Sequence, residues 1–262
     1  MGKYDWIEPC HMADGLYYIG VRSGPCYLLE TTDGIVLIDT AFPNTVDLIL
    51  ENFARIGKDP RKIRHIIHTH GHIDHVGATR ALVEMSGAKT YIGAGDEDAV
   101  RGVNDLIGAK EMGISFTDTF EPDVIVHDGD VLRFGDAEIR FVATPGHTAG
   151  TVSLYFDLLV QGKPYRAGLF GGAGLNTLTL EYLDGHGLSH SMRETFLESI
   201  DKVIDERVDF HIGNHLSDNN FHEKRLHIDD AENPFLTGKT YRSFLETRKQ
   251  QAIRAFAEGS EG

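Results

Sequence analysis

The first sixty residues alternate between strand-like and helix-like hydrophobic spacing. Residues 16–21 and 26–31 are short apolar runs separated by turn residues, and residues 35–39 form the continuous apolar run that is typical of a buried strand. From residue 44 to residue 57 the apolar positions recur at helical spacing, and Asn44 is a favourable N-cap residue for that helix. The pattern therefore predicts strands followed by an amphipathic helix.

The same two spacings continue through the middle of the chain. Residues 62–67 predict a second buried strand, residues 74–87 a helix and residues 88–93 a further strand. The segment 94–121 is polar and contains glycine, with only a weak helical pattern near 96–112, and it is a candidate cover for a cleft. Alternation then returns in residues 123–144, which predicts two or three antiparallel strands.

The last third of the chain again alternates between strand-like and helix-like spacing. Residues 151–156 and 165–172 are strand-like, and the capping-box sequence SMRE opens a helix predicted to run from 191 to about 207. A last buried strand is expected over 208–215, and an amphipathic helix over 239–257. Two β-rich halves flanked by helices predict an α/β fold.

Composition and length agree with a folded protein. The chain has 262 residues, of which 41% are hydrophobic and 25% are charged, and no Pro- or Ser-rich stretch separates its halves. We therefore predict one domain spanning residues 1–262. The two cysteines, Cys10 and Cys26, are expected to be reduced, partly buried thiols rather than a disulfide.

Charge and hydropathy limit the expected partners and location. Twenty-five Lys and Arg against 40 Asp and Glu give a net charge of −15, which disfavours nucleic acid and anionic membranes as partners. No apolar run is long enough to span a membrane. With nucleic acid and membranes disfavoured, a small-molecule substrate is the expected partner. The oligomeric state stays open. The sequence as written starts without a secretory signal and predicts a cytoplasmic protein; a periplasmic or secreted location would apply if a leader has been removed.

The stretch HTHGHIDHVGA, residues 68–78, places four histidines and one aspartate directly after the buried strand 62–67. Ligands bind at the carboxyl ends of strands in open α/β sheets, and histidine is the commonest metal ligand. In an extended turn His70 and His72 point the same way and can share one ion, while Asp74 and His75 point to a second position. His68 is predicted to pack behind the site.

Metal sites of this kind need ligands from elsewhere in the chain. Neither cysteine lies near the histidine stretch, which favours an open hydrolytic zinc site over a closed structural one. The two good candidates each follow a predicted strand: His147 in TPGHTAG and His215 in IGNH. His211 lies within its strand and is expected to be packed.

These motifs resemble those of the metallo-β-lactamase superfamily. THGHIDHVG is similar to its His-x-His-x-Asp-His signature and TPGHTAG to its next histidine motif. GIVLIDT is similar to its early strand, in which Asp39 would support the metal-binding loop from behind. The resemblance implies a four-layer αβ/βα sandwich, the metallo-β-lactamase fold.

The second half is similar to the third subclass of metallo-β-lactamases, subclass B-three. Most dinuclear hydrolases of the superfamily carry a bridging aspartate here, but this chain has no carboxylate between Arg166 and Leu180. The resemblance then implies two zinc ions, Zn²⁺ being the cofactor. The implied ligand sets are His70, His72 and His147 for the first ion and Asp74, His75 and His215 for the second.

The substrate pocket departs from that subclass. Where those lactamases often present serines that hold the substrate carboxylate, this chain has Gly172 and Gly174, with Asn176 as a further candidate. We therefore expect inefficient β-lactam hydrolysis, and expect a serine at position 172 or 174 to strengthen substrate binding. Residues 94–121 and 172–190 are predicted to shape the pocket.

The function predicted from the sequence is a zinc-dependent hydrolase that uses metal-activated hydroxide to open an amide or ester bond, with β-lactams as the first choice of substrate. Asp74 would orient the nucleophile and pass on a proton. The alternatives are a lactonase or thioesterase of the same superfamily with a cytosolic substrate, and a non-catalytic zinc-binding protein. An oxygen-activating iron protein and a nuclease are less favoured, because the bridging carboxylate and a basic patch are both missing.

Overall fold

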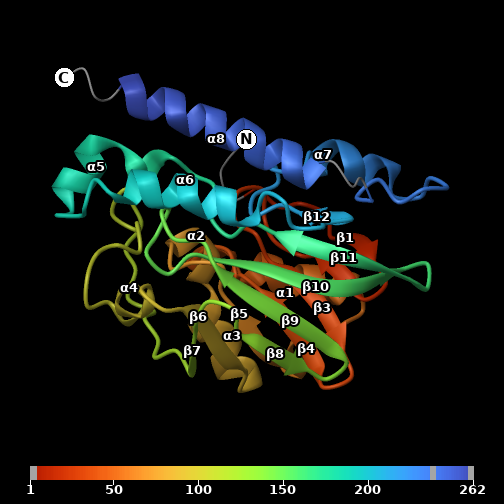
Figure 1. The fold of residues 1–262 in the computed structure, drawn as a ribbon. Coiled ribbons are helices and arrows are strands. Elements are labelled where there is room, and N and C mark those ends of the chain that lie inside the picture. Colours follow the sequence, from red (N-terminus) through yellow and green to blue (C-terminus); the bar gives the residue numbers. More distant parts are fainter. Residues whose placement is uncertain (1–4, 237–239, 259–262) are drawn as a thin grey trace.

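Two β-sheets face each other, and helices cover the outer face of each sheet (Figure 1). The structure is a computed structural model that describes residues 5–236 and 240–258. The layers run helices, sheet, sheet, helices, so the predicted four-layer αβ/βα sandwich is confirmed.

The first sheet has seven strands in the order of the sequence, β1 to β7. Neighbours from β1 to β4 are antiparallel, and neighbours from β4 to β7 are parallel. The parallel part is the half of the sheet that carries the histidine stretch at its carboxyl end. The strands are β1 (Cys10–Ala13), β2 (Leu16–Tyr18), β3 (Tyr27–Thr31), β4 (Gly34–Ile38), β5 (Ile63–Ile67), β6 (Lys89–Gly93) and β7 (Val124–Val126).

The second sheet has five strands in the order β12-β11-β10-β9-β8. All of its pairs are antiparallel except β11 with β12, which are parallel. The strands are β8 (Val131–Phe134), β9 (Ala137–Ala143), β10 (Val152–Val160), β11 (Lys163–Leu169) and β12 (Phe210–Ile212).

Helices fill the two outer layers. On the first sheet lie α1 (Val46–Arg55), α2 (Ile73–Val76), α3 (Thr79–Ser86) and α4 (Glu97–Arg101). The helices of the second half are α5 (Leu180–Gly185), α6 (Met192–Val203), α7 (Phe221–Lys224) and α8 (Thr240–Glu258). None of the helices in the described part of the chain is both long and apolar enough to cross a bilayer.

Side-chain alternation explains why the first sheet is buried on both faces. In β4, Val36 and Ile38 belong to the apolar core between the two sheets, while Ile35 and Leu37 belong to the core beneath α1. Successive side chains of a strand point to opposite faces, so a continuous apolar run fits a strand that is covered on both sides. A third core joins Tyr155 of β10 to α6 and α8.

Several helices are shorter in the structure than the sequence predicted. The helix predicted over 74–87 is divided into α2 and α3, because Gly77 donates its N–H to the Ala41 carbonyl at 2.8 Å rather than to its own helix. An added Cβ at Gly77 would lie 2.3 Å from Pro43 Cδ, so the chain is held against that proline. In the weak 96–112 region, only α4 forms a helix, and turns follow it.

Helix starts also differ from the prediction. Asn44 lies in a 3-10 turn that precedes α1 and does not cap that helix. Ser191 makes no capping bond, because its hydroxyl pairs with that of Ser189 at 2.8 Å, and α6 ends at Val203. Lys239, the first residue of the predicted last helix, lies outside the described residues. Cys10 and Cys26 are free and buried, as predicted.

Candidate metal centre

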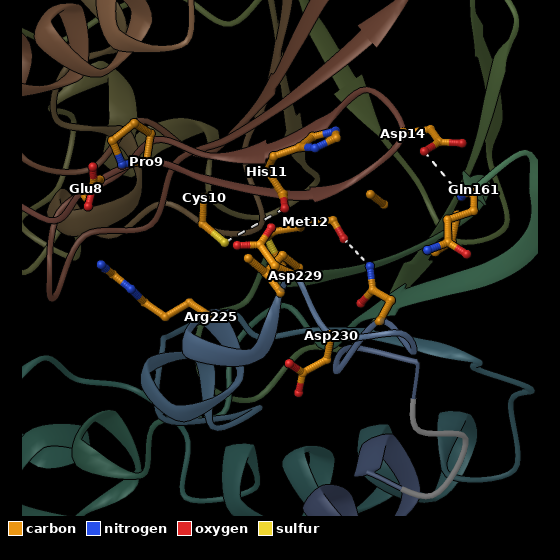
Figure 2. A pocket seen from close by; sticks show the side chains of 14 residues that line it. Glu8, Pro9, Cys10, His11, Met12, Asp14, Gln161, Arg225, Asp229 and Asp230 are labelled. Carbon is orange, nitrogen blue, oxygen red and sulfur yellow. Dashed lines mark hydrogen bonds between the residues drawn. The ribbon is translucent and has the colours of Figure 1, made fainter.

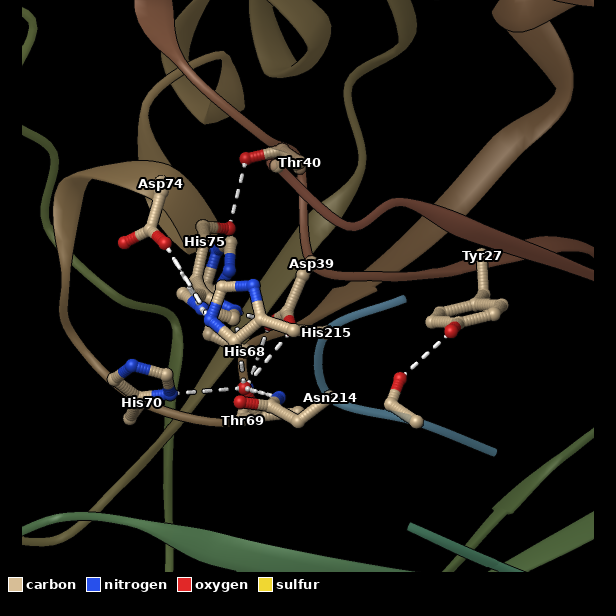
Figure 3. Close-up of polar contacts among 12 residues, drawn as sticks. Tyr27, Asp39, Thr40, His68, Thr69, His70, Asp74, His75, Asn214 and His215 are labelled. Carbon is tan, nitrogen blue, oxygen red and sulfur yellow. Dashed lines mark hydrogen bonds and ion pairs between the residues drawn. The ribbon is translucent and has the colours of Figure 1, made fainter. Parts of the chain in front are cut away.

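Strand ends bring the predicted ligands together. The histidine loop follows β5, Asp39 follows β4 and His215 follows β12 (Figure 3). His147 comes from the loop that follows β9. Carboxyl ends of the parallel strands lie at one edge of the first sheet, and the loops of the second sheet close over that edge. The site is therefore assembled from both halves of the chain.

The first cluster consists of His70, His72 and His147. One nitrogen from each ring lies within 4.8 Å of the others, which is close enough for three ligands of one ion. The ring centroids are 4.6–4.8 Å apart, and all three side chains are buried. The structure thus brings together the three residues that the resemblance assigned to one zinc.

The second cluster consists of Asp74, His75 and His215. His75 Nε2 lies 3.3 Å from His215 Nε2 and 3.4 Å from Asp74 Oδ2. The His75 ring is fully buried, whereas the His215 side chain is 36% exposed. The two clusters adjoin each other, since the ring centroids of His70 and His75 are 4.0 Å apart.

Hydrogen bonds fix which nitrogen of three histidines faces the centre. His75 Nδ1 donates to Asp39 Oδ2 at 2.8 Å, and His147 Nδ1 donates to the Gly174 carbonyl at 2.9 Å. The Thr69 hydroxyl donates to Asp39 and therefore accepts from His70 Nδ1, at 3.1 Å. A ring that is protonated on Nδ1 keeps a lone pair on Nε2, which is the form that binds a metal.

Asp39 forms hydrogen bonds with two residues of the histidine loop. Besides holding His75, its carboxylate accepts the Thr69 N–H at 2.8 Å and the Thr69 hydroxyl at 2.9 Å. Its backbone lies in the left-handed region at φ 61°, which non-glycine residues seldom adopt. Such strain is found at functional sites, where surrounding contacts hold the residue in place.

Electrostatics separate the two clusters. Burial holds the pKa of His70 and His147 well below the ordinary value and lowers the pKa of His72 to about 4, so these rings are neutral. Burial acts the same way on His75, but the carboxylates of Asp74 and Asp39 outweigh it and raise its pKa to about 10. The second cluster therefore favours a positive charge, and the first does not.

Gly172 and Gly174 lie against the ring of His147. A Cβ added at Gly172 would be 2.8 Å from His147 Cδ2, and one at Gly174 would be 2.8 Å from His147 Cε1. The space that we expected a serine to use for substrate binding is thus occupied by the ring of His147. Substitution there would displace the ring, so the expected gain in substrate binding does not follow. Asn176 is exposed and remains a candidate.

Several supporting residues were not predicted from the sequence. Thr69 and Asn214 form a chain of hydrogen bonds behind His70, with Asn214 Nδ2 donating to Thr69 Oγ1 at 3.0 Å. Thr177 donates to the His147 carbonyl at 2.7 Å, and buried Asp96 bonds to two loops of the site. Isolated polar residues carry no spacing signal, although Asp96 does follow a strand end.

Two packed histidines behave as predicted. His68 is buried, and its Nε2 pairs with the Thr79 hydroxyl at 3.1 Å, behind the metal loop. His211 is buried within β12 against Tyr241 and Phe244. Neither belongs to a cluster of potential metal ligands in the described part of the chain.

A pocket opens beside the first cluster. His72 and His147 form part of its wall, and both segments predicted to shape a pocket contribute to it. The segment after β6 supplies Leu106, and the α5 region supplies Tyr182 and Leu188. The remaining wall residues are Gly71, Gly95, Asp96, Ala99, Thr148, Ala149 and Met192. The pocket is mostly apolar, and no lysine or arginine lines it.

A second hollow, between β1 and the segment after α7, shares no residue with the clusters (Figure 2). Cys10 lies on its wall beside His11, Arg225 and Asp229. Burial raises the pKa of the Cys10 thiol to about 11, so it stays protonated and is a poor nucleophile. In the part of the chain that is described, no three potential ligands around this hollow approach closely enough to share an ion.

Comparison with known proteins identifies the family. The model of the metallo-beta-lactamase superfamily matches residues 19–159, more than half of the 262-residue chain. The chain belongs to the metallo-β-lactamase superfamily. The match includes five of the six clustered residues; His147 is the last of them, and His215 lies beyond it.

Sequence relatives cover only parts of the chain. It is 39% identical over 108 residues to a hydroxyacylglutathione hydrolase of Chelativorans sp. (strain BNC1), which spans 41% of this chain and 34% of the relative. It is 36% identical over 120 residues to an uncharacterized protein of Aquifex aeolicus, across 42% of this chain and 56% of the relative. The chain thus spans about a third to just over half of these relatives' lengths.

Solved structures match over the whole fold. BJP-1, a subclass B3 metallo-β-lactamase of Bradyrhizobium japonicum, has a TM-score of 0.90 at 23% identity, covering 98% of this chain and 97% of that one. Native FEZ-1 from Legionella gormanii also has a TM-score of 0.90, at 22% identity over all of both chains. At these identities the likeness shows a shared fold.

Proposed function

We propose that this protein is a zinc-dependent hydrolase with two metal ions, similar to the subclass B3 enzymes, that opens an amide or ester bond in a small molecule. The observation that carries the proposal is the pair of adjoining clusters, each with three potential ligand atoms that lie within 4.8 Å of one another. Catalytic zinc sites keep a coordination position open, and three protein ligands per ion leave room for one.

The residues fit a metal ion. His70 Nε2 is buried and has no hydrogen-bond partner among the described residues. Buried polar atoms are almost always paired, and an unpaired ring nitrogen beside two other histidines is explained by an ion that accepts its lone pair. Five imidazoles and a single carboxylate, without a thiolate, suit zinc.

The ligand set also supports hydrolysis. Zinc supplies Lewis acidity, which lowers the pKa of water towards 7 and polarises a carbonyl group. With five imidazoles, each of which is neutral when it binds a metal, and one carboxylate, the protein would neutralise little of the ions' charge. Asp74 is the residue proposed to orient the attacking water and to carry its proton to the leaving group.

The pocket supports a substrate with an apolar group next to the scissile bond. Leu106, Tyr182 and Leu188 offer apolar and aromatic surface beside His72 and His147. No cationic side chain is present on that wall to hold a β-lactam carboxylate. The absence of such a side chain and the similarity to a hydroxyacylglutathione hydrolase together favour a second candidate, a lactone or thioester hydrolase.

The deciding experiment is a panel assay of the zinc-loaded protein with a chromogenic cephalosporin, a simple lactone and a thioester. We expect cephalosporin turnover with a high KM, because the pocket lacks a charged partner for the carboxylate. Lactone or thioester turnover alone would select the second candidate. No turnover of any substrate by protein holding two zinc ions would contradict both and leave a non-catalytic zinc-binding protein.

A further inference from the structure

Asp96 connects two loops that carry ligands of the first cluster. It follows β6 and is buried, with 4% of its surface exposed. Its Oδ2 accepts the Gly71 N–H at 2.7 Å and the Thr148 hydroxyl at 2.6 Å, and its Oδ1 accepts the Gly150 N–H at 2.8 Å. One carboxylate therefore receives three hydrogen bonds from two separate loops.

The bonded groups are direct neighbours of the ligands. Gly71 stands between His70 and His72, and Thr148 follows His147. A shift of either partner would therefore move a ligand ring. We propose that Asp96 is a positioning residue, which ties the 70–72 loop to the His147 loop and so sets the spacing of the first cluster.

Close backbone packing supports this role. A Cβ added at Gly150 would lie 2.7 Å from Asp96 Cβ, and one added at Gly71 would lie 3.1 Å from the same atom. Both loops thus approach Asp96 more closely than a residue with a side chain would allow. The absence of side chains at these two positions lets one short carboxylate reach both backbone N–H groups.

The position of Asp96 at the start of α4 also supports a positioning role. Asp96 is the N-cap residue of α4, where an aspartate commonly accepts a bond from its own helix, but it makes no such capping bond. Its oxygens are directed at the two ligand loops instead. Burial of the carboxylate is costly, and three donors, including a hydroxyl, offset that cost.

The experiment measures zinc binding at each cluster separately. The inference rests on the metal site proposed above. Zinc affinity is measured by chelator competition in two variants of the full chain, Asp74→Ala, which keeps the first cluster, and His72→Ala, which keeps the second. Asp96→Asn replaces one acceptor oxygen with an NH₂ group that cannot accept from an N–H. We expect it to weaken zinc binding about 10- to 100-fold in the first background and less than about threefold in the second.

Asp98→Asn is the matched control, because Asp98 lies on the same helix, its side chain is exposed and it forms an ion pair with Arg101 at 3.5 Å. It should leave zinc affinity unchanged in both backgrounds. Equal weakening in both backgrounds by Asp96→Asn, or a lower melting temperature with unchanged zinc affinity, would show a purely structural residue and overturn the proposal.

A milder variant covers the case in which Asp96→Asn does not fold. Thr148→Val removes one of the three bonds and should weaken first-cluster zinc binding severalfold, while Thr148→Ser keeps the hydroxyl and should restore it. Unchanged binding in Thr148→Val would count against Asp96. Failure of the proposed function would give a different result from failure of the Asp96 proposal. In that case the unmodified chain would bind no zinc or would bind it without hydrolysing any substrate.

Discussion

The two ligand clusters adjoin each other but are stabilised differently. The first consists of three buried, neutral histidines from two loops, and its supports are hydroxyl and backbone groups together with Asp96. The second contains a carboxylate, has Asp39 behind His75, and reaches solvent through His215. The first cluster thus depends mainly on the positions of its rings, and the second depends mainly on charge.

This difference has a physical consequence. A carboxylate attracts a cation over several ångströms, so small displacements in the second cluster cost little Coulomb energy. Neutral imidazoles bind through directed lone pairs, so displacement of a ring in the first cluster removes the interaction. Substitutions that remove charge should therefore impair the second cluster, and substitutions that add volume should impair the first.

The largest effect is expected for Asp74→Asn. It removes the only carboxylate among the six clustered residues, so bound zinc should fall from about two ions per chain to about one, and kcat/KM on the best panel substrate should fall about 100- to 10,000-fold. Metal analysis after dialysis and steady-state kinetics test this. Retention of both ions at full activity would contradict the role of charge in the second cluster.

Asp39→Asn should have the next largest effect. It keeps the shape of the side chain but removes the charge behind His75, which should weaken second-cluster zinc binding about 10- to 100-fold. Chelator competition in the His72→Ala background measures this cluster alone. A larger loss of zinc affinity in the Asp74→Ala background would mean that Asp39 acts mainly through Thr69 and His70. The contrast between a charge-dependent second cluster and a position-dependent first cluster would then be wrong.

Gly172→Ala tests the dependence of the first cluster on ring position. The added methyl group would meet His147 Cδ2 at 2.8 Å, so we expect a loss of about 1–3 kcal/mol in the free energy of unfolding, with weaker zinc binding at the first cluster only. Denaturant unfolding and chelator competition provide the two measurements. Gly185→Ala, where no atom lies within 4 Å of the added group, is the matched control and should change neither.

The smallest effect is expected at the pocket wall. Tyr182→Ala removes aromatic surface from the pocket that His72 and His147 also line, and Tyr182 belongs to neither cluster. For substrates with an aromatic substituent KM should rise about three- to tenfold at unchanged kcat, and KM for small substrates should not change. Equal effects on both substrate classes, or a lower zinc content, would show that Tyr182 supports the centre rather than the substrate.

The clustered residues could be named from the sequence because they lie in short motifs, and the resemblance to the superfamily divided them into two sets. The spacing of His70, His72, Asp74 and His75 within one turn follows from local chain geometry, and strand ends marked His147 and His215 as candidates. The hydrophobic pattern likewise predicted most strands and an α/β fold, whereas the four-layer sandwich was expected only from the resemblance to the superfamily. These features depend on contacts that are near in sequence or on periodicities that one sequence displays.

Only the tertiary structure showed how the ligands are held and how much space surrounds them. Asp96 is 25 residues from Gly71 and 54 from Gly150, and no periodicity links these positions. The crowding of Gly172 by His147 is equally invisible in sequence, and for that reason a serine there was expected to contact substrate. Such relations depend on how separate loops pack at one sheet edge, so local spacing determines the ligands and long-range packing determines their positions.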